Sequence, residues 1–517
     1  MAAPASTYSF EPFIDALGKD FFEDDPDLSV LLSYHGLEPG ESWDKVSRYG
    51  KFSASAGAAG AEATDRPDSL PQLLPFDAYG EPHPVGVSVP QATRRVLAAA
   101  LRAGVATEPD VRVRYAMAYL GAQVGEAGVM CPLACTDGLV RTLQELDGGV
   151  RAQAALEHIL LQAPHGPVHG AQFVTEVQGG SDAGTNRVRA VPQEDGSYRL
   201  YGPKWFCSNA WAQYWAVTAR PEDAPDGPRG VGLFLVPREE PLGTANGFRL
   251  DRLKDKLGTR SLPTAEMTLD GAKAWPLGDL RSGLSNVVRI VLTTSRFWCA
   301  LAATAQIRAA ERIAHAYAHF RNAFGQPIAS FPLVAETLEQ LTRDRRHLLA
   351  GCFEVLAIWE RVAAAERSGE APDPQDALRA RLLVMMAKTV CTRRGTQRVH
   401  DAMMVLGGNG IEERFSALPR LLRDAVILET WEGPHGLLTS RLLLDMGKHG
   451  GAEDPAGLAG LILGGQADDA EKEAVGEALA HALGQGDARV QALAFSDWLH
   501  QCFDVFGASC WRAASGD

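Results

Sequence analysis

The chain has 517 residues, 46% of them hydrophobic, and a formal net charge of −14. This length predicts two to four packed domains, and the negative charge argues against a nucleic-acid partner, because such proteins use a basic face to release counterions from phosphates. We find no apolar run that would span a bilayer, and the N-terminal "MAAPASTYSFEPF" lacks the basic flank and apolar core of a secretory signal. We therefore expect a cytoplasmic protein without a membrane partner.

The eight cysteines are sparse and form no CxxC pair. The closest are Cys131 with Cys135 and Cys502 with Cys510, and neither pair has the further ligands of a zinc site. We expect reduced thiols and no metal. The segment 452–517 carries three basic side chains against eleven acidic ones, which argues against a DNA-binding tail.

Residues 1 to about 90 read as irregular, with "SASAGAAGAEATDRPDS" as a loop of small residues. Helical periodicity begins in "PQATRRVLAAALRAG" and returns in "VRYAMAYLGAQVGEAG" and "VRAQAALEHILLQ". From about 170 to 275 the pattern changes to short alternating runs such as "WAVTA", "GVGLFLV" and "AEMTL". The runs "RVRAV" and "YRLYG" flank "QEDGS", which predicts a hairpin. This block is expected to form a small barrel or sandwich.

Three long helical patterns follow, joined by connectors that contain glycine and proline, as in a helical bundle. A shorter helical pair precedes the linker "KHGGAEDPAGLAG", and the tail sequence "LAFSDWLHQCFDVFG" predicts a packed amphipathic helix that serves as an assembly surface. The fold class is therefore mainly α with a central β-barrel domain. The expected divisions are an N-terminal extension and α-helical domain over 1–165, a barrel over 166–285, a helical bundle over 286–447 and an additional helical tail over 455–517.

Two segments of the β block combine turn residues with ligand-binding groups. In "VTEVQGGSDAGTNRVRA" the paired glycines let a backbone pass close to a ligand, and Thr175 and Ser181 supply hydroxyls on either side. In "YGPKWFCSNAWAQYW" the aromatic Phe206 precedes Ser208, which suits a flat conjugated ligand. A tight turn and a barrel rim with core aromatics are the alternative interpretations.

Two further segments lie at helix ends. Arg321 in "AYAHFRNAFGQPI" has a planar fork that suits a pyrophosphate, or it is a capping charge. In "MVLGGNGIEERF" the turn exposes backbone N–H groups that suit phosphate, or it is a helix cap.

Together these motifs follow one another in the order of the acyl-CoA dehydrogenase family. The resemblance covers about 95 to 447 and rests on "TEvqGGSD", "KWFcSN", "DKLGTRSLPTAEM", "RnaFGqPI", "vLGGNGi" and "LLRDAvILetWEG". Within the family the chain is most similar to the AidB branch, a likeness that extends to "LLPFDAYG" and "EAGVMCPLACT". The resemblance implies an α-helical domain, a middle β-barrel and a C-terminal four-helix bundle around FAD.

The resemblance also assigns roles to single residues. Thr175 matches a threonine that hydrogen-bonds the flavin, Ser181 a serine at the flavin or its pyrophosphate, and Phe206 the aromatic beside the isoalloxazine. Ser208 replaces a threonine that reaches flavin N5. The FAD adenosine diphosphate would be held by Arg321, Phe324 and the turn of Gly407, Gly408 and Asn409. Some of these contacts cross a subunit interface in the family, which implies a dimer or tetramer.

Glu432, in "ETWEGPHG", matches the carboxylate that removes the α-proton of an acyl thioester, carried by CoA or by a carrier protein. Such a base needs a raised pKa, which burial beside Trp431 and a flavin would provide. The alternative is an ordinary acid at a helix start, where its pKa would fall. Ser295 occupies the position of an alternative base in other members and cannot serve.

Several residues depart from the family pattern. Pro434 stands where a Thr or Ser often touches the flavin, and Met404 where a Gln often meets the adenosine end. Pro332 occupies another usual glutamine position, and Thr293 replaces a common acidic residue that helps hold the CoA chain. The leading hypothesis is an FAD-dependent dehydrogenase that forms an enoyl thioester, and the alternatives are an AidB-like protein that protects DNA and a flavin oxidase or monooxygenase. The electron acceptor stays unknown.

Overall fold

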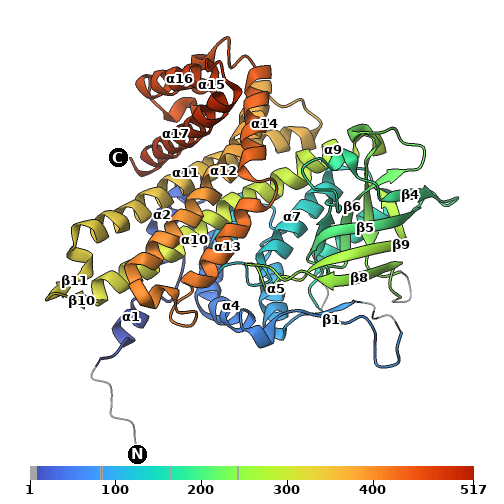
Figure 1. Cartoon of the computed structure of the whole chain (residues 1–517), viewed down its shortest axis with the longest axis horizontal. Coiled ribbons are helices and arrows are strands. Elements are labelled where there is room, and N and C mark those ends of the chain that lie inside the picture. Colours follow the sequence, from blue (N-terminus) through green and yellow to red (C-terminus); the bar gives the residue numbers. More distant parts are fainter. Residues whose placement is uncertain (1–7, 82, 84, 163–165, 241–243, 517) are drawn as a thin grey trace, which may run out of the picture.

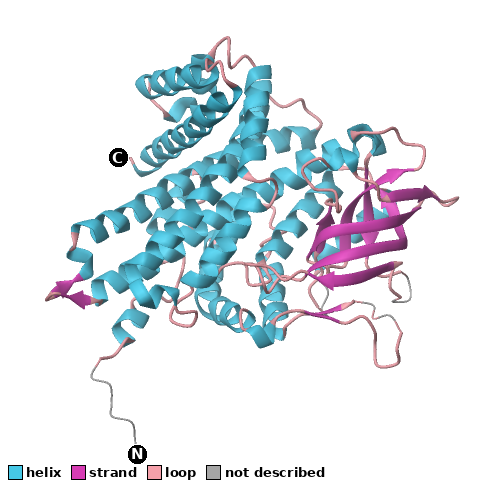
Figure 2. Ribbon diagram, in the orientation of Figure 1, coloured by secondary structure: helices cyan, strands magenta, loops and turns pink. Residues whose placement is uncertain are grey.

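The computed structural model describes residues 8–81, 83, 85–162, 166–240 and 244–516. Its barrel strands gather on one side of the molecule, the short β hairpin over residues 322–327 lies at the opposite end, and most of the remainder is helical (Figures 1 and 2). One continuous hydrophobic core runs from the N-terminal helices through the bundle into the C-terminal tail, with Leu28, Leu349 and Phe503 among its buried members.

The N-terminal part is mostly helical. Its elements are α1 Glu11–Asp15, α2 Pro26–Tyr34, α3 Glu41–Phe52, a π-helical turn Ser53–Gly57, α4 Ala58–Thr64, β1 Gln72–Leu73, β2 Val87–Ser88, α5 Gln91–Ala103, α6 Val111–Ala122, α7 Met130–Glu145 and α8 Gly149–Leu161. The helices expected from "PQATRRVLAAALRAG" onward are confirmed. The expectation of an irregular first 90 residues, with a loop over the small-residue stretch, is wrong.

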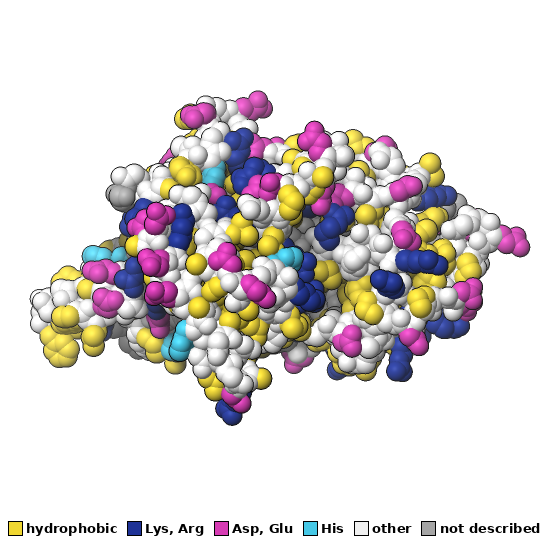
Figure 3. All heavy atoms as spheres, turned by 90° about the horizontal axis from the view of Figure 1, so that it is seen from above, with side chains coloured by type: hydrophobic (Ala, Val, Ile, Leu, Met, Phe, Trp, Pro, Cys, Tyr) yellow, Lys and Arg dark blue, Asp and Glu magenta, His cyan; other side chains and the backbone are white. Residues whose placement is uncertain are grey.

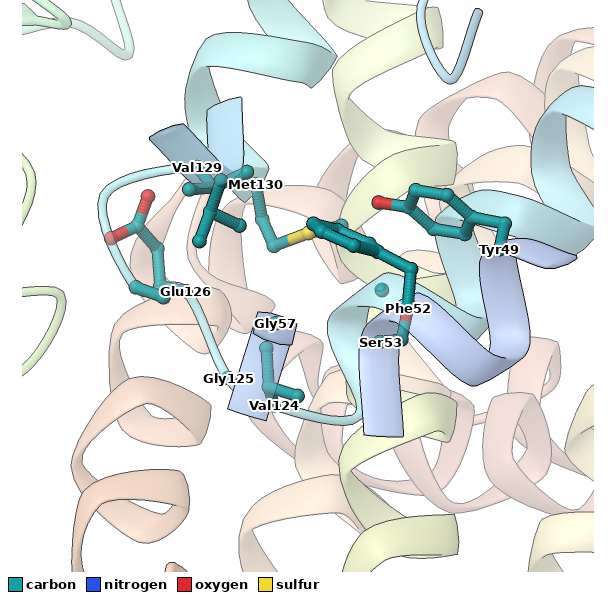
Figure 4. Close-up of a pocket in the computed structure, with 12 residues that line it drawn as sticks. Tyr49, Phe52, Ser53, Gly57, Val124, Gly125, Glu126, Val129 and Met130 are labelled. Carbon is teal, nitrogen blue, oxygen red and sulfur yellow. The ribbon is translucent and has the colours of Figure 1, made fainter. Parts of the chain in front are cut away.

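That small-residue stretch is helical because close packing needs small side chains there. Alanine has the best helix propensity, and a Cβ on Gly60 would lie 2.4 Å from a methyl carbon of Val96 on α5. Tyr49 and Phe52 of α3 face Val129 and Met130 at the start of α7 (Figure 4). Tertiary packing therefore orders a composition that is also typical of loops.

The β block is a closed barrel. Its strands are β3 Gly170–Phe173, β4 Arg189–Pro192, β5 Tyr198–Ser208, β6 Tyr214–Pro221, β7 Gly232–Pro237, β8 Phe248–Leu253 and β9 Thr264–Pro276. Strands β4, β5, β9, β7 and β6 pair in a ring, with β3 added beside β6 and β8 beside β9. The predicted hairpin is confirmed as the antiparallel pair β4–β5, with Ala190 opposite Leu200.

The bundle begins with a helical run from Leu280. Its elements are α9 Gly283–Asn286, a π-helical turn Val287–Leu292, α10 Thr293–Phe320, β10 Asn322–Ala323, β11 Gln326–Pro327, α11 Pro332–Ser368, α12 Pro374–Leu406, α13 Leu418–Thr430 and α14 His435–Lys448. The run Leu280–Phe320 is long and apolar enough to cross a membrane, contrary to the expectation that the chain has no such run. However, 72% of its most apolar window is buried inside the protein. Packing against its neighbours explains that apolar character.

The tail forms α15 Pro455–Leu463, α16 Asp469–Leu483 and α17 Ala488–Ser515, which lie beside α11 and α14 (Figure 1). The apolar face of α17 is buried within the same chain: Phe495, Trp498 and Phe503 are at most 2% exposed. A Cβ on Gly507 would lie 2.4 Å from the carbonyl oxygen of His347, so α17 approaches the backbone of α11 closely. The predicted packed helix is confirmed, whereas its role in assembly stays a prediction.

Candidate functional site

The end of β5 places a pair of hydroxyls at the rim of the barrel. Ser208 and Thr264 are opposite each other in the β5–β9 register, and their oxygens lie 3.1 Å apart. The next residue, Asn209, has a φ of 60° and is fully buried. Its Nδ2 donates 2.7 Å to the carbonyl of Gly170, which anchors the turn after β5 to β3. Ser208 is thereby held at a fixed position on the rim.

The glycine-rich turn after β3 folds back over Thr175. A Cβ on Gly180 would lie 2.7 Å from Thr175 Oγ1, so only glycine allows this approach. The Trp205 N–H donates 3.0 Å to the Thr175 carbonyl, which brings the turn next to β5. Ser181 lies in the same turn and is exposed.

A buried ion pair holds this turn on the barrel. Lys204, on β5, is 1% exposed and donates 2.9 Å to Oε1 of Glu176, which is 2% exposed. Glu176 also accepts hydrogen bonds from the N–H groups of Arg187 and Val188 at 2.6 and 3.2 Å. The Lys204 charge and these donors keep the pKa of Glu176 below its ordinary value despite burial.

Phe206 lies on β5, two residues before Ser208, and 50% of its surface is exposed, so its aromatic ring is open to a ligand. The ammonium nitrogen of Lys254 lies 4.4 Å from its ring centre and 3.5 Å from that of Trp205. An exposed aromatic ring beside donors of fixed position suits a planar conjugated ligand.

Glu432 lies just beyond the end of α13 in an unusual backbone conformation. Its φ is 56°, and it is one of six non-glycine residues with a positive φ in the described part of the chain. Such a conformation costs of the order of 1–3 kcal/mol and is often found at functional sites. Burial raises the pKa of its carboxyl above the ordinary value, and this outweighs the opposite effects of Arg296, Lys388 and a hydrogen bond from Ser295. Glu432 is therefore suited to be a base.

Two cations hold the backbone around Glu432. Lys388 on α12 is fully buried and donates to the carbonyl oxygens of Glu429 and Gly433 at 2.8 and 2.7 Å. Burial lowers the pKa of Lys388 to about 8. Arg296 on α10 donates 3.0 Å to the Glu432 carbonyl. These bonds satisfy carbonyls that the end of α13 leaves unpaired.

Asp424 on α13 joins three parts of the fold at this site. Its carboxylate accepts from the Glu126 N–H at 3.0 Å and from the Thr259 N–H at 2.6 Å. These residues belong to the loop before α7 and the loop between β8 and β9. A Cβ on Gly258 would lie 2.1 Å from the Arg423 carbonyl oxygen, so the barrel loop presses directly on α13. Trp431 packs against Cys131, Cys135 and Leu262 at the same junction.

The other predicted cofactor residues lie at the far end of α10. Ser295 is near its start and Arg321 just after its end, which places them about 39 Å apart along the axis. Arg321 is exposed and donates 3.2 Å to the Tyr8 hydroxyl. Phe324, at the tip of the β10–β11 hairpin, is 99% exposed and has a φ of 52°.

The glycine turn lies near this end as well. Asn409 Nδ2 donates 3.0 Å to the Tyr317 hydroxyl on α10. Gly407 has a φ of 59°, and a Cβ on Gly408 would meet nothing within 4 Å, so the turn is open to a ligand. Within one chain, the predicted site residues thus form two groups that do not meet. The first group is Thr175, Ser181, Phe206, Ser208 and Glu432, and the second is Arg321, Phe324, Gly407, Gly408 and Asn409.

Sequence reasoning missed Lys388 and Asp424 as members of the site. Each had a signal, because a charged residue inside an apolar run is rarely buried without a partner. Lys388 interrupts "LLVMMAKTVC", and Asp424 lies in "LLRDAVIL". No group of side chains in the described ranges has the composition of a metal site, and all eight cysteines are free and buried.

The residues of the first group fit a flavin ring. The open face of Phe206, the hydroxyls of Thr175 and Ser208, and the raised pKa of Glu432 supply the stacking surface, edge donors and base that the ring and its substrate require. The open turn at Gly408 offers space and backbone N–H groups for a pyrophosphate.

Comparison with known families and proteins gives consistent matches. The sequence matches the acyl-CoA dehydrogenase middle domain over residues 171–272 and the acyl-CoA dehydrogenase C-terminal domain over 281–443. It is 35% identical to AidB of Escherichia coli K12 over 408 residues, covering 74% of this chain and 70% of AidB. It is 34% identical to acyl-CoA dehydrogenase family member 11 of Caenorhabditis elegans, covering 65% of this chain and 55% of that protein.

Solved structures share the fold over nearly the whole chain. The apo form of Bd2924 superposes with a TM-score of 0.85 at 26% identity, covering 96% of this chain and 98% of that chain. Caenorhabditis elegans ACDH-11 in complex with C11-CoA gives 0.79 at 25% identity, covering 100% and 94%. An acyl-CoA dehydrogenase of Bacillus anthracis complexed with FAD shares the fold at 17% identity with a TM-score of 0.66, covering 82% and 77%.

Proposed function

Because the chain belongs to the acyl-CoA dehydrogenase family of FAD-dependent oxidoreductases, which act on CH–CH bonds, we propose that it converts an acyl thioester into its trans-2,3-enoyl product with Glu432 as the base. The observation that carries the proposal is the partly buried Glu432, whose carboxyl has a pKa raised by desolvation and whose backbone is fixed by Lys388 and Arg296. A base of this kind matches the weak acidity of a proton next to a thioester carbonyl.

The neighbours of Glu432 support this role. Gln172 Nε2 donates 2.8 Å to Ser295 Oγ. That leaves the Ser295 hydrogen free to point toward the Glu432 carboxylate and stabilise its charged form. Bound FAD would supply the acceptor for the β-hydrogen, and the Ser208 hydroxyl would hold the flavin at N5. Trp431 packs against Cys131, Cys135 and Leu262 at the junction next to this region.

An acyl thioester is favoured as the substrate class by the relatives. Caenorhabditis elegans ACDH-11 is seen with C11-CoA, and a 28% identical relative of Pseudomonas fluorescens is an L-prolyl-[peptidyl-carrier protein] dehydrogenase. Recognition of the CoA chain by Thr293 is disfavoured, because its hydroxyl donates 3.0 Å to the Val288 carbonyl of its own helix. The carrier is therefore decided by other surfaces.

The test is an anaerobic titration of the FAD-loaded protein with acyl-CoA and acyl-carrier-protein thioesters of varied chain length. We expect at least one thioester to bleach the flavin absorbance without oxygen and to yield an enoyl product by mass spectrometry. A panel in which every thioester leaves the flavin oxidised would contradict the proposal. Turnover that occurs only in air and releases peroxide would favour an oxidase instead.

We also propose a homo-oligomer in which the Arg321 and Phe324 end of one subunit completes the flavin site of another. Within one chain this end lies about 39 Å from Ser295, and a fully exposed aromatic in a strained turn is typical of a contact surface. Light scattering is expected to give a dimer or tetramer, and Phe324→Ser to weaken both assembly and FAD binding by tenfold or more. Phe76→Ser, at another exposed aromatic, is the control. A monomer that binds FAD tightly would contradict this assignment.

A nucleic-acid partner is disfavoured by charge. The net charge is −14, and the tail over 452–517 has a large excess of acidic residues. On the face seen in Figure 3, basic and acidic side chains are interspersed, and no large patch of Lys and Arg stands alone. A DNA-protective role like that implied by the AidB branch would predict a salt-sensitive shift of duplex DNA, and we expect none at physiological salt.

A further inference from the structure

Lys256 lies between the barrel rim and the helices that carry the base. It is in the loop between β8 and β9, and its ammonium donates to the Leu262 carbonyl at 2.8 Å and to Thr264 Oγ1 at 2.9 Å. Thr264 Oγ1 is in turn 3.1 Å from Ser208 Oγ. A continuous path of hydrogen bonds therefore leads from the ammonium of Lys256 to the hydroxyl assigned to flavin N5.

The donor chemistry gives this path a direction. An ammonium group has three hydrogens and no acceptor, so Thr264 Oγ1 must accept from Lys256. The Thr264 hydrogen is then free to donate to Ser208, and the Ser208 hydrogen is left free to donate to a ligand. Without the ammonium either hydroxyl could be the donor, and this fixed direction would be lost.

Acidic groups and a thiol from other elements surround Lys256. Glu126 precedes α7, Cys131 lies on it, and Asp424 is on α13; all three favour the charged form of Lys256, although burial lowers its pKa overall. The Glu126 carboxylate is turned away from Tyr49 and Phe52 (Figure 4) and accepts from the Gly128 N–H at 2.7 Å. Burial, together with Asp424, raises the pKa of Glu126. Lys256 is thus the cation of a buried cluster.

The simplest alternative is a purely structural lysine that braces its own loop. Its bond to the carbonyl of Leu262, in the same loop, supports that role. A structural role does not explain the second hydrogen bond, from the Lys256 ammonium to Thr264 Oγ1. The Leu262 carbonyl alone would be enough to brace the loop.

We propose that Lys256 is a positioning residue for the flavin: through Thr264 it orients the Ser208 hydroxyl toward N5 and places a positive charge beside the ring. The inference rests on the proposed assignment of Ser208 to N5. It predicts that Lys256 favours reduced over oxidised flavin, since a nearby cation stabilises the electron-rich reduced ring.

The test measures the flavin midpoint potential by reductive titration without any thioester, so its outcome does not depend on the substrate proposal. Lys256→Met is expected to weaken binding of reduced relative to oxidised FAD about tenfold, which for this two-electron couple lowers the potential by about 30 mV. Lys256→Arg, which keeps the charge and the donors, is expected to restore most of the shift. Lys273→Met is the matched control, because Lys273 lies on β9 but pairs with Asp195 at 2.8 Å on the surface.

Thr264→Val removes the bridging hydroxyl at nearly constant shape and keeps the charge. It is expected to lower the potential by less than Lys256→Met and to reduce FAD affinity severalfold. If Lys256→Met fails to fold, this second variant decides. A potential and an FAD affinity equal to those of the wild type in Thr264→Val, or an unchanged potential in folded Lys256→Met, would overturn the proposal.

Discussion

Glu432→Gln is expected to slow thioester-dependent flavin reduction by about 10²–10⁴-fold, the usual contribution of a positioned base. The amide keeps the size of the carboxyl but takes no proton, whereas FAD content and the visible spectrum stay close to wild type. Stopped-flow absorbance under anaerobic conditions measures the rate. Because the pKa of Glu432 is raised and the base must be ionised, the wild-type rate rises with pH through that pKa and levels off above it.

The matched control is Glu429→Gln, in the last turn of α13 and three residues before Glu432. Glu429 pairs with His435 at 2.8 Å and with Arg393 at 3.2 Å, and these partners hold its pKa at about 2. A carboxyl of that kind is a poor base, so this variant should retain the rate. If Glu432→Gln reduced flavin as fast as wild type, Glu432 would not be the base.

Lys204→Met is expected to lower the free energy of unfolding by about 3–5 kcal/mol, because it leaves the buried Glu176 carboxylate without its cation. The pair is almost completely inaccessible, with side-chain exposures of 0% and 3%. Loss of the pair should also loosen the turn that carries Thr175 and weaken FAD binding. Denaturant unfolding and calorimetry measure the first effect, and fluorescence titration with FAD the second.

Lys273→Met is the control for this prediction too. Lys273 also lies in the barrel and forms an ion pair, with Asp195, but that pair is on the surface, where such pairs contribute little. We expect its unfolding to match that of the wild type. Equal stability of Lys204→Met and Lys273→Met would show that burial of the first pair is not what stabilises the barrel.

Local patterns were sufficient for most of the architecture. The alternating runs before β9 and the long 3.6-residue periods after it predicted the barrel and the helices, because one face of each element has to be apolar. The hairpin between β4 and β5 followed from turn residues alone. The stretch from Ser53 to Thr64 was misread, since small residues are common in loops and its helix depends on packing against α5.

In the candidate site, too, some features follow from the sequence and others only from the packing. The sequence by itself predicted which residues carry the chemistry, because motifs such as "TEVQGGSD" and "ETWEGPHG" hold their functional groups within a few positions. Only the tertiary structure decided which of them meet. The desolvation of the Glu432 carboxyl, the hydrogen-bond path from Lys256 to Ser208 and the distance of Phe324 from Ser295 depend on how elements far apart in the chain are arranged. Desolvation and hydrogen-bond direction are properties of that packing, and no local pattern encodes them.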